Sequence, residues 1–188
     1  MNDKFKDAFA GVVAEHYAKP CIARHFGLPV SKILHDAGSS KDKNLKIDFQ
    51  MFTRLHGDMM VDLKSSISYE TSVCIDKDHP IFDSTSIAHG DRWIGCLFSK
   101  SSTLYLVKAS RELEHIAILK GEFRVVCESD VKRLPKILVE EINIDVPFGK
   151  FFDTTFGKDK PWTRCKNKDE AIDLAKAFGE QMCSDIPS

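Results

Sequence analysis

The chain has 188 residues and a formal net charge of −1, with 43% hydrophobic and 29% charged residues. A chain of this length buries roughly two-thirds of its unfolded surface, so folding requires neither disulfides nor a structural metal. The charge balance excludes a uniformly basic coat for nucleic acid, although it is compatible with a local basic surface.

The cysteines and the apolar runs bear on the cellular compartment. The six cysteines are scattered through the chain without a CxxC pair, and several lie in apolar stretches. Because the N-terminus lacks the pattern of a signal peptide, we expect reduced thiols and a cytoplasmic protein. No apolar run approaches the ~20 residues that a membrane-spanning helix needs, so we expect no membrane partner.

The first elements that the pattern predicts are helical. Apolar residues recur at helical spacing over residues 3–18, and Pro20 is expected to end this helix. A second short helical stretch is predicted around residues 21–26. Residues 36–44 are polar and contain glycine, which is typical of a loop.

A hairpin is predicted next. Two strand-like runs, 45–54 and 58–66, are separated by Leu55-His56-Gly57. A three-residue connection that ends in glycine suits a type I turn followed by a bulge, because glycine tolerates the left-handed backbone conformation.

The rest of the chain predicts shorter elements. Residues 68–90 carry turn formers and little periodicity, which indicates a long functional or mobile loop. The remaining predictions are a hairpin of strands 93–98 and 103–107, a short helix capped by Ser110, a strand over 121–127, a helix capped by Ser129 or Asp130 that runs to about 142, and a final amphipathic helix over 168–182. This order favours a mixed α/β or α+β fold, in which helices flank a central sheet.

Three charged residues on the first hairpin are the most informative feature of the sequence. Asp62 and Lys64 are two apart on one strand, so their side chains project from the same face. With the turn centred on His56, Asp48 lies opposite Lys64. If the register is shifted by two residues, Asp48 lies opposite Asp62 instead. Either register brings all three side chains to one face, whereas a slip by one residue would separate them.

The surroundings of the two aspartates are unusual for surface decoration. Asp48 lies between Ile47 and Phe49, and Asp62 lies between Val61 and Leu63. Charges inside apolar strands are costly unless they are paired or bound to a cation.

A divalent cation would relieve the repulsion between two adjacent carboxylates. Hard oxygen ligands of this kind suit Mg²⁺ or Mn²⁺. With a metal held by Asp48 and Asp62, Lys64 could orient an attacking water or assist its deprotonation. These residue types therefore point to hydrolysis of a phosphodiester.

The pattern of Asp48 followed on the next strand by Asp62-Leu63-Lys64 resembles the PD-(D/E)xK nuclease superfamily, which has the restriction-endonuclease-like fold. The resemblance implies a mixed sheet of about four or five core strands with helices on both sides. It also implies Mg²⁺-dependent cutting of DNA, with Asp48 and Asp62 as the two acids and Lys64 as the motif lysine.

Two further positions bear on this resemblance. Many members of the superfamily carry a glutamate on the helix before the hairpin, and Glu15 is the matching residue here. The chain departs from the family name at Ile47, which stands where the motif has proline, a substitution that is common in the superfamily. The resemblance covers roughly residues 3–127 in the order of its elements. We expect residues 1–147 to form the nuclease-like core domain, and residues 148–188 to pack on it as a basic, aromatic segment and a helix.

Contacts with nucleic acid are predicted mainly in the segment 158–168. Its basic residues could neutralise phosphates, and Trp162 could stack on a base or insert between bases. The basic residues are Lys158, Lys160, Arg164, Lys166 and Lys168. Ser65, directly after the motif lysine, lies where the substrate backbone would pass. The alternative for this segment is a solvated linker whose Trp162 packs on the body.

The functional prediction is a metal-dependent nuclease that acts on nucleic acid, specifically a DNA endonuclease. Such small enzymes frequently act as homodimers to cut two strands, although the sequence shows no interface. One alternative is a catalytically inactive domain of the same fold that binds nucleic acid or protein, and another is a domain in which the charged cluster is only a salt bridge.

Two other features of the sequence have simpler explanations. A second acid-x-lysine sequence, Asp130-Val131-Lys132, lies at a predicted helix start, where Asp130 is explained as a cap. His56, His79 and His89 could contact phosphate or move protons, but scattered histidines of this kind are more often ordinary loop residues.

Overall fold

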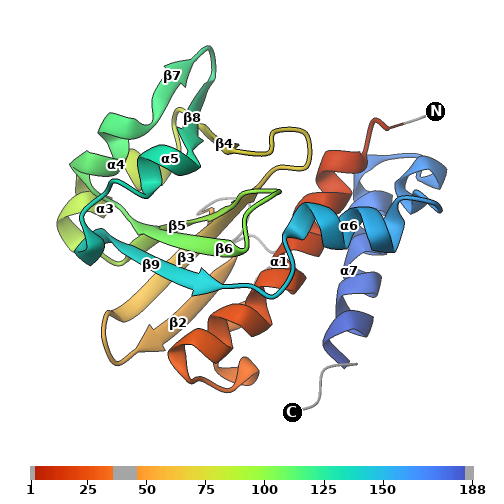
Figure 1. Ribbon diagram of the computed structural model, residues 1–188, viewed down its shortest axis with the longest axis horizontal. Helices are drawn as coiled ribbons and strands as arrows, with labels where there is room; N and C mark the ends of the chain where they lie inside the picture. The colour runs from red at the N-terminus through yellow and green to blue at the C-terminus, as the bar shows by residue number, and fades with distance from the viewer. Residues whose placement is uncertain (1–2, 36–45, 185–188) are drawn as a thin grey trace.

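The computed structural model describes residues 3–35 and 46–184, with side chains through Met182. A mixed β-sheet lies at its centre, with long helices on one face and a smaller sheet with short helices on the other (Figure 1). Within the described residues the central sheet has six strands, in the spatial order β1 (Leu34–His35), β2 (Phe49–Thr53), β3 (Gly57–Ser65), β5 (Arg92–Leu97), β6 (Thr103–Lys108) and β9 (Val139–Asn143). Strands β3 and β5 run parallel, and the other neighbours run antiparallel.

The second sheet and the helices complete the described fold. The small sheet has the order β4 (Ser72–Asp76), β8 (Phe123–Cys127) and β7 (Ile118–Lys120). The α-helices are α1 (Lys6–Phe26), α3 (Ser84–His89), α4 (Arg111–Ile116), α5 (Glu128–Val131), α6 (Phe148–Phe156) and α7 (Lys168–Ser184). Four short 3₁₀ segments join them: η1 (Val30–Lys32), η2 (Pro80–Phe82), η3 (Lys136–Leu138) and η4 (Pro161–Arg164).

Helix α1 continues through Pro20, so the prediction that this proline ends the helix is wrong. Proline removes one backbone hydrogen bond, but buried residues recur on one face both before and after it, including Ala18 and Ile22. Packing of this continuous apolar face outweighs the local cost. The helix ends instead at Gly27, whose positive φ of 64° allows its N–H to bond back to the last turn.

The first hairpin forms as predicted, with the register shifted by two residues. Phe49 pairs with Val61, and Thr53 pairs with Gly57, whose φ is +69°. Only glycine adopts this left-handed conformation without strain, which explains its place at the end of the turn. Among the two registers considered from the sequence, the observed one places Asp48 level with Asp62 rather than with Lys64.

The later elements agree with the sequence in part. The hairpin of β5 and β6, the Ser110 cap of α4 and the final helix α7 are confirmed. The helix predicted over residues 130–142 is wrong, because α5 ends at Val131 and the chain then enters η3 and β9. Pairing of β9 with β6, far away in the sequence, decides this outcome.

The small sheet was not foreseen. Strand β4, η2 and α3 occupy the segment that was predicted as a long loop, and β7 precedes the strand predicted over 121–127. The predicted loop over residues 36–44 lies outside the described residues.

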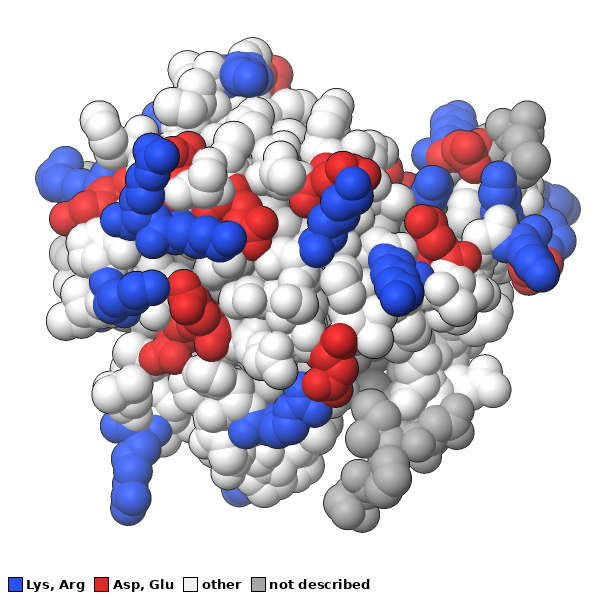
Figure 2. All heavy atoms as spheres, viewed as in Figure 1, with Lys and Arg blue, Asp and Glu red and all other residues white. Residues whose placement is uncertain are grey.

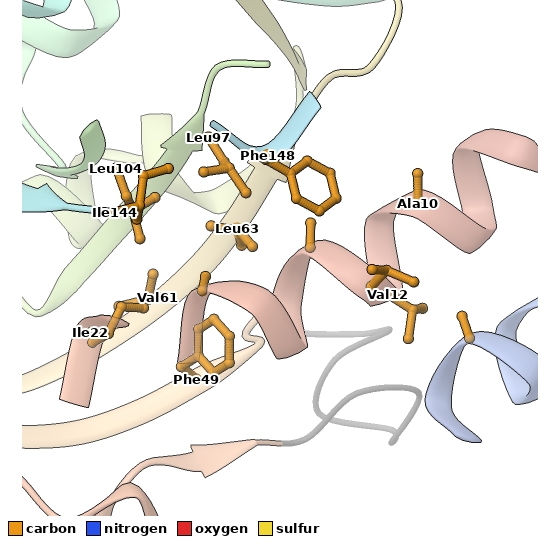
Figure 3. Close-up of a cluster of buried hydrophobic side chains, with 14 of the residues drawn as sticks. Ala10, Val12, Ile22, Phe49, Val61, Leu63, Leu97, Leu104, Ile144 and Phe148 are labelled. Atoms are coloured by element: carbon orange, nitrogen blue, oxygen red, sulfur yellow. The ribbon is translucent and has the colours of Figure 1, made fainter. Parts of the chain in front are cut away.

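Two apolar cores lie on the two faces of the central sheet. One face packs against α1, α6 and α7, and Figure 3 shows Phe49, Val61 and Leu63 of this face directed toward the helix side chains. The other face packs against β4, β8 and the short helices, with Ile94 and Tyr105 among its buried residues.

The molecule is therefore a mixed α+β fold whose central sheet has one or two more strands than the four or five expected. The segment from residue 148 onward shares the apolar core of α1. In the described part of the chain no helix is both long and apolar enough to cross a membrane. The five cysteines whose side chains are described are all free thiols.

Candidate active site at the start of the first hairpin

The carboxyl groups of Asp48 and Asp62 meet on the face of the central sheet that is turned away from α1. Asp48 directly precedes β2, and its Oδ2 accepts a hydrogen bond from the Leu63 N–H at 2.8 Å. The hairpin register places Asp48 level with Asp62, so the two carboxyl groups lie side by side. Both residues are buried, with exposures of 4% and 5%. The backbone of β3 thus holds the first acid beside the second.

Lys64 completes the predicted trio. Its Nζ lies 3.0 Å from Oδ2 of Asp62, and its side chain retains 26% exposure. Burial by itself would lower the pKa of the Lys64 ammonium, but the negative charge of Asp62 outweighs this effect and raises it. The nearby carboxylates of Asp48 and Asp76 act in the same direction. The lysine is therefore held in its charged form, between the acids and solvent.

His79 is part of the same cluster, although the sequence placed it among scattered loop histidines. Its Nδ1 accepts a hydrogen bond from the Ile81 N–H at 3.0 Å, so the ring hydrogen resides on Nε2. That Nε2 donates to Oδ2 of Asp62 at 2.7 Å. Since the His79 side chain is only 1% exposed, both nitrogens are fixed by the protein. Only the fold, which brings η2 onto β3, could reveal this contact.

The electrostatics of Asp62 follow from these neighbours. Burial raises the pKa of a carboxyl group, but the hydrogen bond from His79 and the charge of Lys64 hold the pKa of Asp62 well below its usual value. Two ionised carboxyl groups side by side repel each other unless a proton or a cation lies between them. The arrangement is thus able to accept positive charge between Asp48 and Asp62.

The donor set fits a small hard cation. Two buried carboxyl groups supply the oxygen ligands that Mg²⁺ and Mn²⁺ prefer, and these ions take their remaining ligands from water or substrate. Within residues 3–35 and 46–184, no group of three or more His, Cys, Asp or Glu side chains is arranged to hold a metal. Any ion here would therefore be held by the two aspartates.

Glu15 lies elsewhere. Its Oε1 pairs with Nε2 of His35 at 2.9 Å, and the His35 ring packs on Phe49 with ring centroids 4.9 Å apart. Phe49 belongs to the core between the sheet and α1, whereas Asp62 projects from the opposite face. The structure thus brings three of the four predicted catalytic residues together and places Glu15 in a separate ion pair.

The basic segment before α7 is only partly open to a ligand. Trp162 is 1% exposed, stacks on Phe152 at 5.5 Å and donates its indole N–H to Asp3. It is therefore a core residue and is not available to stack on a base, which agrees with the alternative considered for this segment. Arg164 pairs through both terminal nitrogens with Asp159.

The lysines of this segment remain on the surface. Lys158, Lys166 and Lys168 are exposed, and Lys160 is half-buried. On the face drawn in Figure 2, basic side chains gather at the end of the molecule near α6, with acidic side chains between them. Ser65 is half-buried at the end of β3 and lines a depression of about 220 Å³ beside α1.

The other two histidines differ from His79. His56 and His25 both pair with Glu140, at 2.6 and 2.9 Å, which links the hairpin turn and the end of α1 to β9. His89 is exposed at the end of α3.

Comparison with known proteins gives no match. Neither a protein-family model, nor a curated protein, nor a solved structure matches this chain. A functional assignment therefore rests on the residues and the geometry described above.

Proposed function

We propose that the chain is a divalent-metal-dependent phosphodiester hydrolase acting on nucleic acid, with DNA endonuclease as its specific activity. The observation that carries this proposal is the contact between the Asp48 and Asp62 carboxyl groups beside the Lys64 ammonium. The same residues form the motif that resembles the PD-(D/E)xK superfamily.

Each residue of the cluster has a distinct role in this proposal. Asp48 and Asp62 hold Mg²⁺ or Mn²⁺, and the bound ion supplies positive charge against the charge that develops on the phosphoryl oxygens. Lys64 orients the attacking water and stabilises negative charge. Its raised pKa favours these roles over removal of a proton. His79 positions Asp62 by occupying one carboxylate oxygen.

Nicking of supercoiled plasmid in Mg²⁺ or Mn²⁺ tests the proposal. We expect Lys64→Ala to lower the rate about 100-fold or more, because a charged group beside the reacting phosphate is lost. Lys132→Ala is the matched control, since Lys132 stands in the same acid-x-lysine spacing but is exposed beyond the end of α5. Equal rates for the wild-type chain and Lys64→Ala would contradict the catalytic assignment.

A domain in which the charged cluster is only a salt bridge is the second candidate, and burial of the two carboxyl groups favours it. Asp62 already has two partners within the protein, so the cluster can stabilise the fold as a buried ion pair. Calorimetric titration with Mn²⁺ separates the candidates. The hydrolase requires Mn²⁺ binding that Asp48→Asn abolishes, whereas the second candidate predicts no such binding and no nicking.

A further inference from the structure

A depression of about 360 Å³ lies along the same sheet face as Asp48 and Asp62, although neither of these two aspartates is among its lining residues. Gln50 of β2 pairs with Leu34 of β1 on one side and with Met60 of β3 on the other, and all three residues line the depression. Because side chains alternate along a strand, these residues share the face of Asp62. Their row is two residues from the aspartates, which corresponds to ~7 Å along the strand.

Within the described residues, this part of the sheet face is left uncovered. The small sheet and the short helices pack over the residues of β5 and β6. Over β1 and β2, in contrast, Phe52 is 66% exposed and Leu34 is 57% exposed. A ligand that reaches the aspartates along the sheet would therefore pass over these two side chains.

The chemistry of the depression suits a single nucleotide. Phe52 offers an aromatic ring, and Lys32 at the rim offers a positive charge. Aromatic rings stack on unpaired bases of any sequence, and lysine neutralises phosphate. Asp58 and Asp91 also line the depression and would repel phosphates, and a duplex with two phosphate backbones would be repelled more than a single strand.

We propose that this depression binds an unpaired base of the strand that is cut, with the base on Phe52 and the adjoining phosphate beside Lys32. This inference rests on the proposed function, and it names the substrate class: single-stranded or locally unpaired nucleic acid. Leu34 and Met60 supply apolar contacts to the base.

The test is the binding of a fluorescein-labelled, single-stranded 12-nucleotide DNA, followed by anisotropy in a Lys64→Ala background that does not turn over. We expect Phe52→Ala to weaken binding about tenfold or more, because one stacked base is lost. Lys32→Ala should weaken it a few-fold and reduce its salt dependence. The matched control is Leu119→Ala, which removes a side chain of 57% exposure from β7. The same sequence as a duplex should bind more weakly.

Three results would overturn the inference. The first is that the oligonucleotide does not bind, and the second is that Phe52→Ala and Leu119→Ala bind it with equal affinity. The third is that Phe52→Ala changes only the self-association of the chain, measured by sedimentation velocity. Plasmid nicking by the wild-type chain, measured alongside, separates this inference from the proposed function. If the wild-type chain nicks plasmid and Phe52→Ala binds the oligonucleotide with unaltered affinity, the inference about the depression is wrong and the proposed hydrolase function stands. If oligonucleotide binding depends on Phe52 but the chain neither nicks plasmid nor binds Mn²⁺, the base site is supported and the proposed hydrolase function is wrong.

Discussion

At the scale of single residues, the centre of this protein is one buried carboxylate with several partners. Asp62 accepts one hydrogen bond from His79 and lies against Lys64 and Asp48. A charge in the interior is tolerated only when such partners replace water, so each partner contributes to stability as well as to the geometry of the site.

The His79 contact gives the first prediction. His79→Ala leaves the Ile81 N–H without its acceptor and removes a hydrogen-bond donor from Asp62. We therefore expect the free energy of unfolding, measured by urea denaturation, to fall by about 2–4 kcal/mol. Because His79 also orients Asp62, Mn²⁺ affinity should fall roughly tenfold. His79→Gln, which retains a donor, should recover part of both effects.

The matched control is His89→Ala, which changes an exposed histidine and should leave both quantities nearly unchanged. A loss of stability with unaltered Mn²⁺ affinity would show that His79 supports the fold without positioning Asp62.

At this scale, a contact of the site could be predicted from the sequence only where its residues lie close together along the chain. The alternation of a strand brings Asp62 and Lys64 to one face, and a hairpin turn of known length brings Asp48 to them. The sequence therefore indicated this trio. His79 reaches Asp62 from η2, and Glu15 faces the other side of the sheet, and neither fact follows from local periodicity.

At the scale of elements, the packing of α1 against α7 organises the helical side of the molecule. Gly179 of α7 lies against His16 of α1, where a Cβ would come within 2.3 Å of the imidazole ring. Burial, helped by the charge of His35, lowers the pKa of His16 to about 4. A neutral ring is thus packed on a helix backbone that has no side chain at that point.

Two helical glycines give a matched pair of substitutions. Gly179→Ala must push His16 away, so we expect the free energy of unfolding to fall by about 1–3 kcal/mol. Gly11→Ala in α1 meets nothing within 4 Å and should raise it by about 0.5–1 kcal/mol, because alanine favours the helix. Urea denaturation of both variants checks the pair, and a similar effect of the two changes would argue against this close helix contact.

At the scale of the whole molecule, both faces of the central sheet are covered by segments far away in the sequence. Residues after 147 supply Phe152, Phe156 and Trp162 to the core that α1 shares, where their rings contact Phe9. The C-terminal segment is thus part of the same core as the predicted body.

Removal of this segment gives the last prediction. A chain that ends at residue 147 would expose Phe9 and the face of α1, so we expect it to lose cooperative thermal unfolding and to bind hydrophobic dyes. In the full chain, the milder substitution Phe152→Ala should lower the free energy of unfolding by about 3–5 kcal/mol. A truncated chain that still unfolds cooperatively near the temperature of the full chain would show that α6 and α7 are dispensable.

The sequence by itself determined the features that depend on near neighbours: the hairpin with its glycine, the Ser110 cap, helix α7, the mixed fold class and the shared face of Asp48, Asp62 and Lys64. Periodicity, capping and turn chemistry act over a few residues, so they can be read directly from the chain.

Only the tertiary structure decided the continuation of α1 through Pro20, the strand β9 in place of a helix, the burial of Trp162 and the approach of His79 to Asp62. Each of these outcomes depends on pairing or packing between segments distant in the sequence. The free energy of such contacts exceeds the local propensities that a single chain displays.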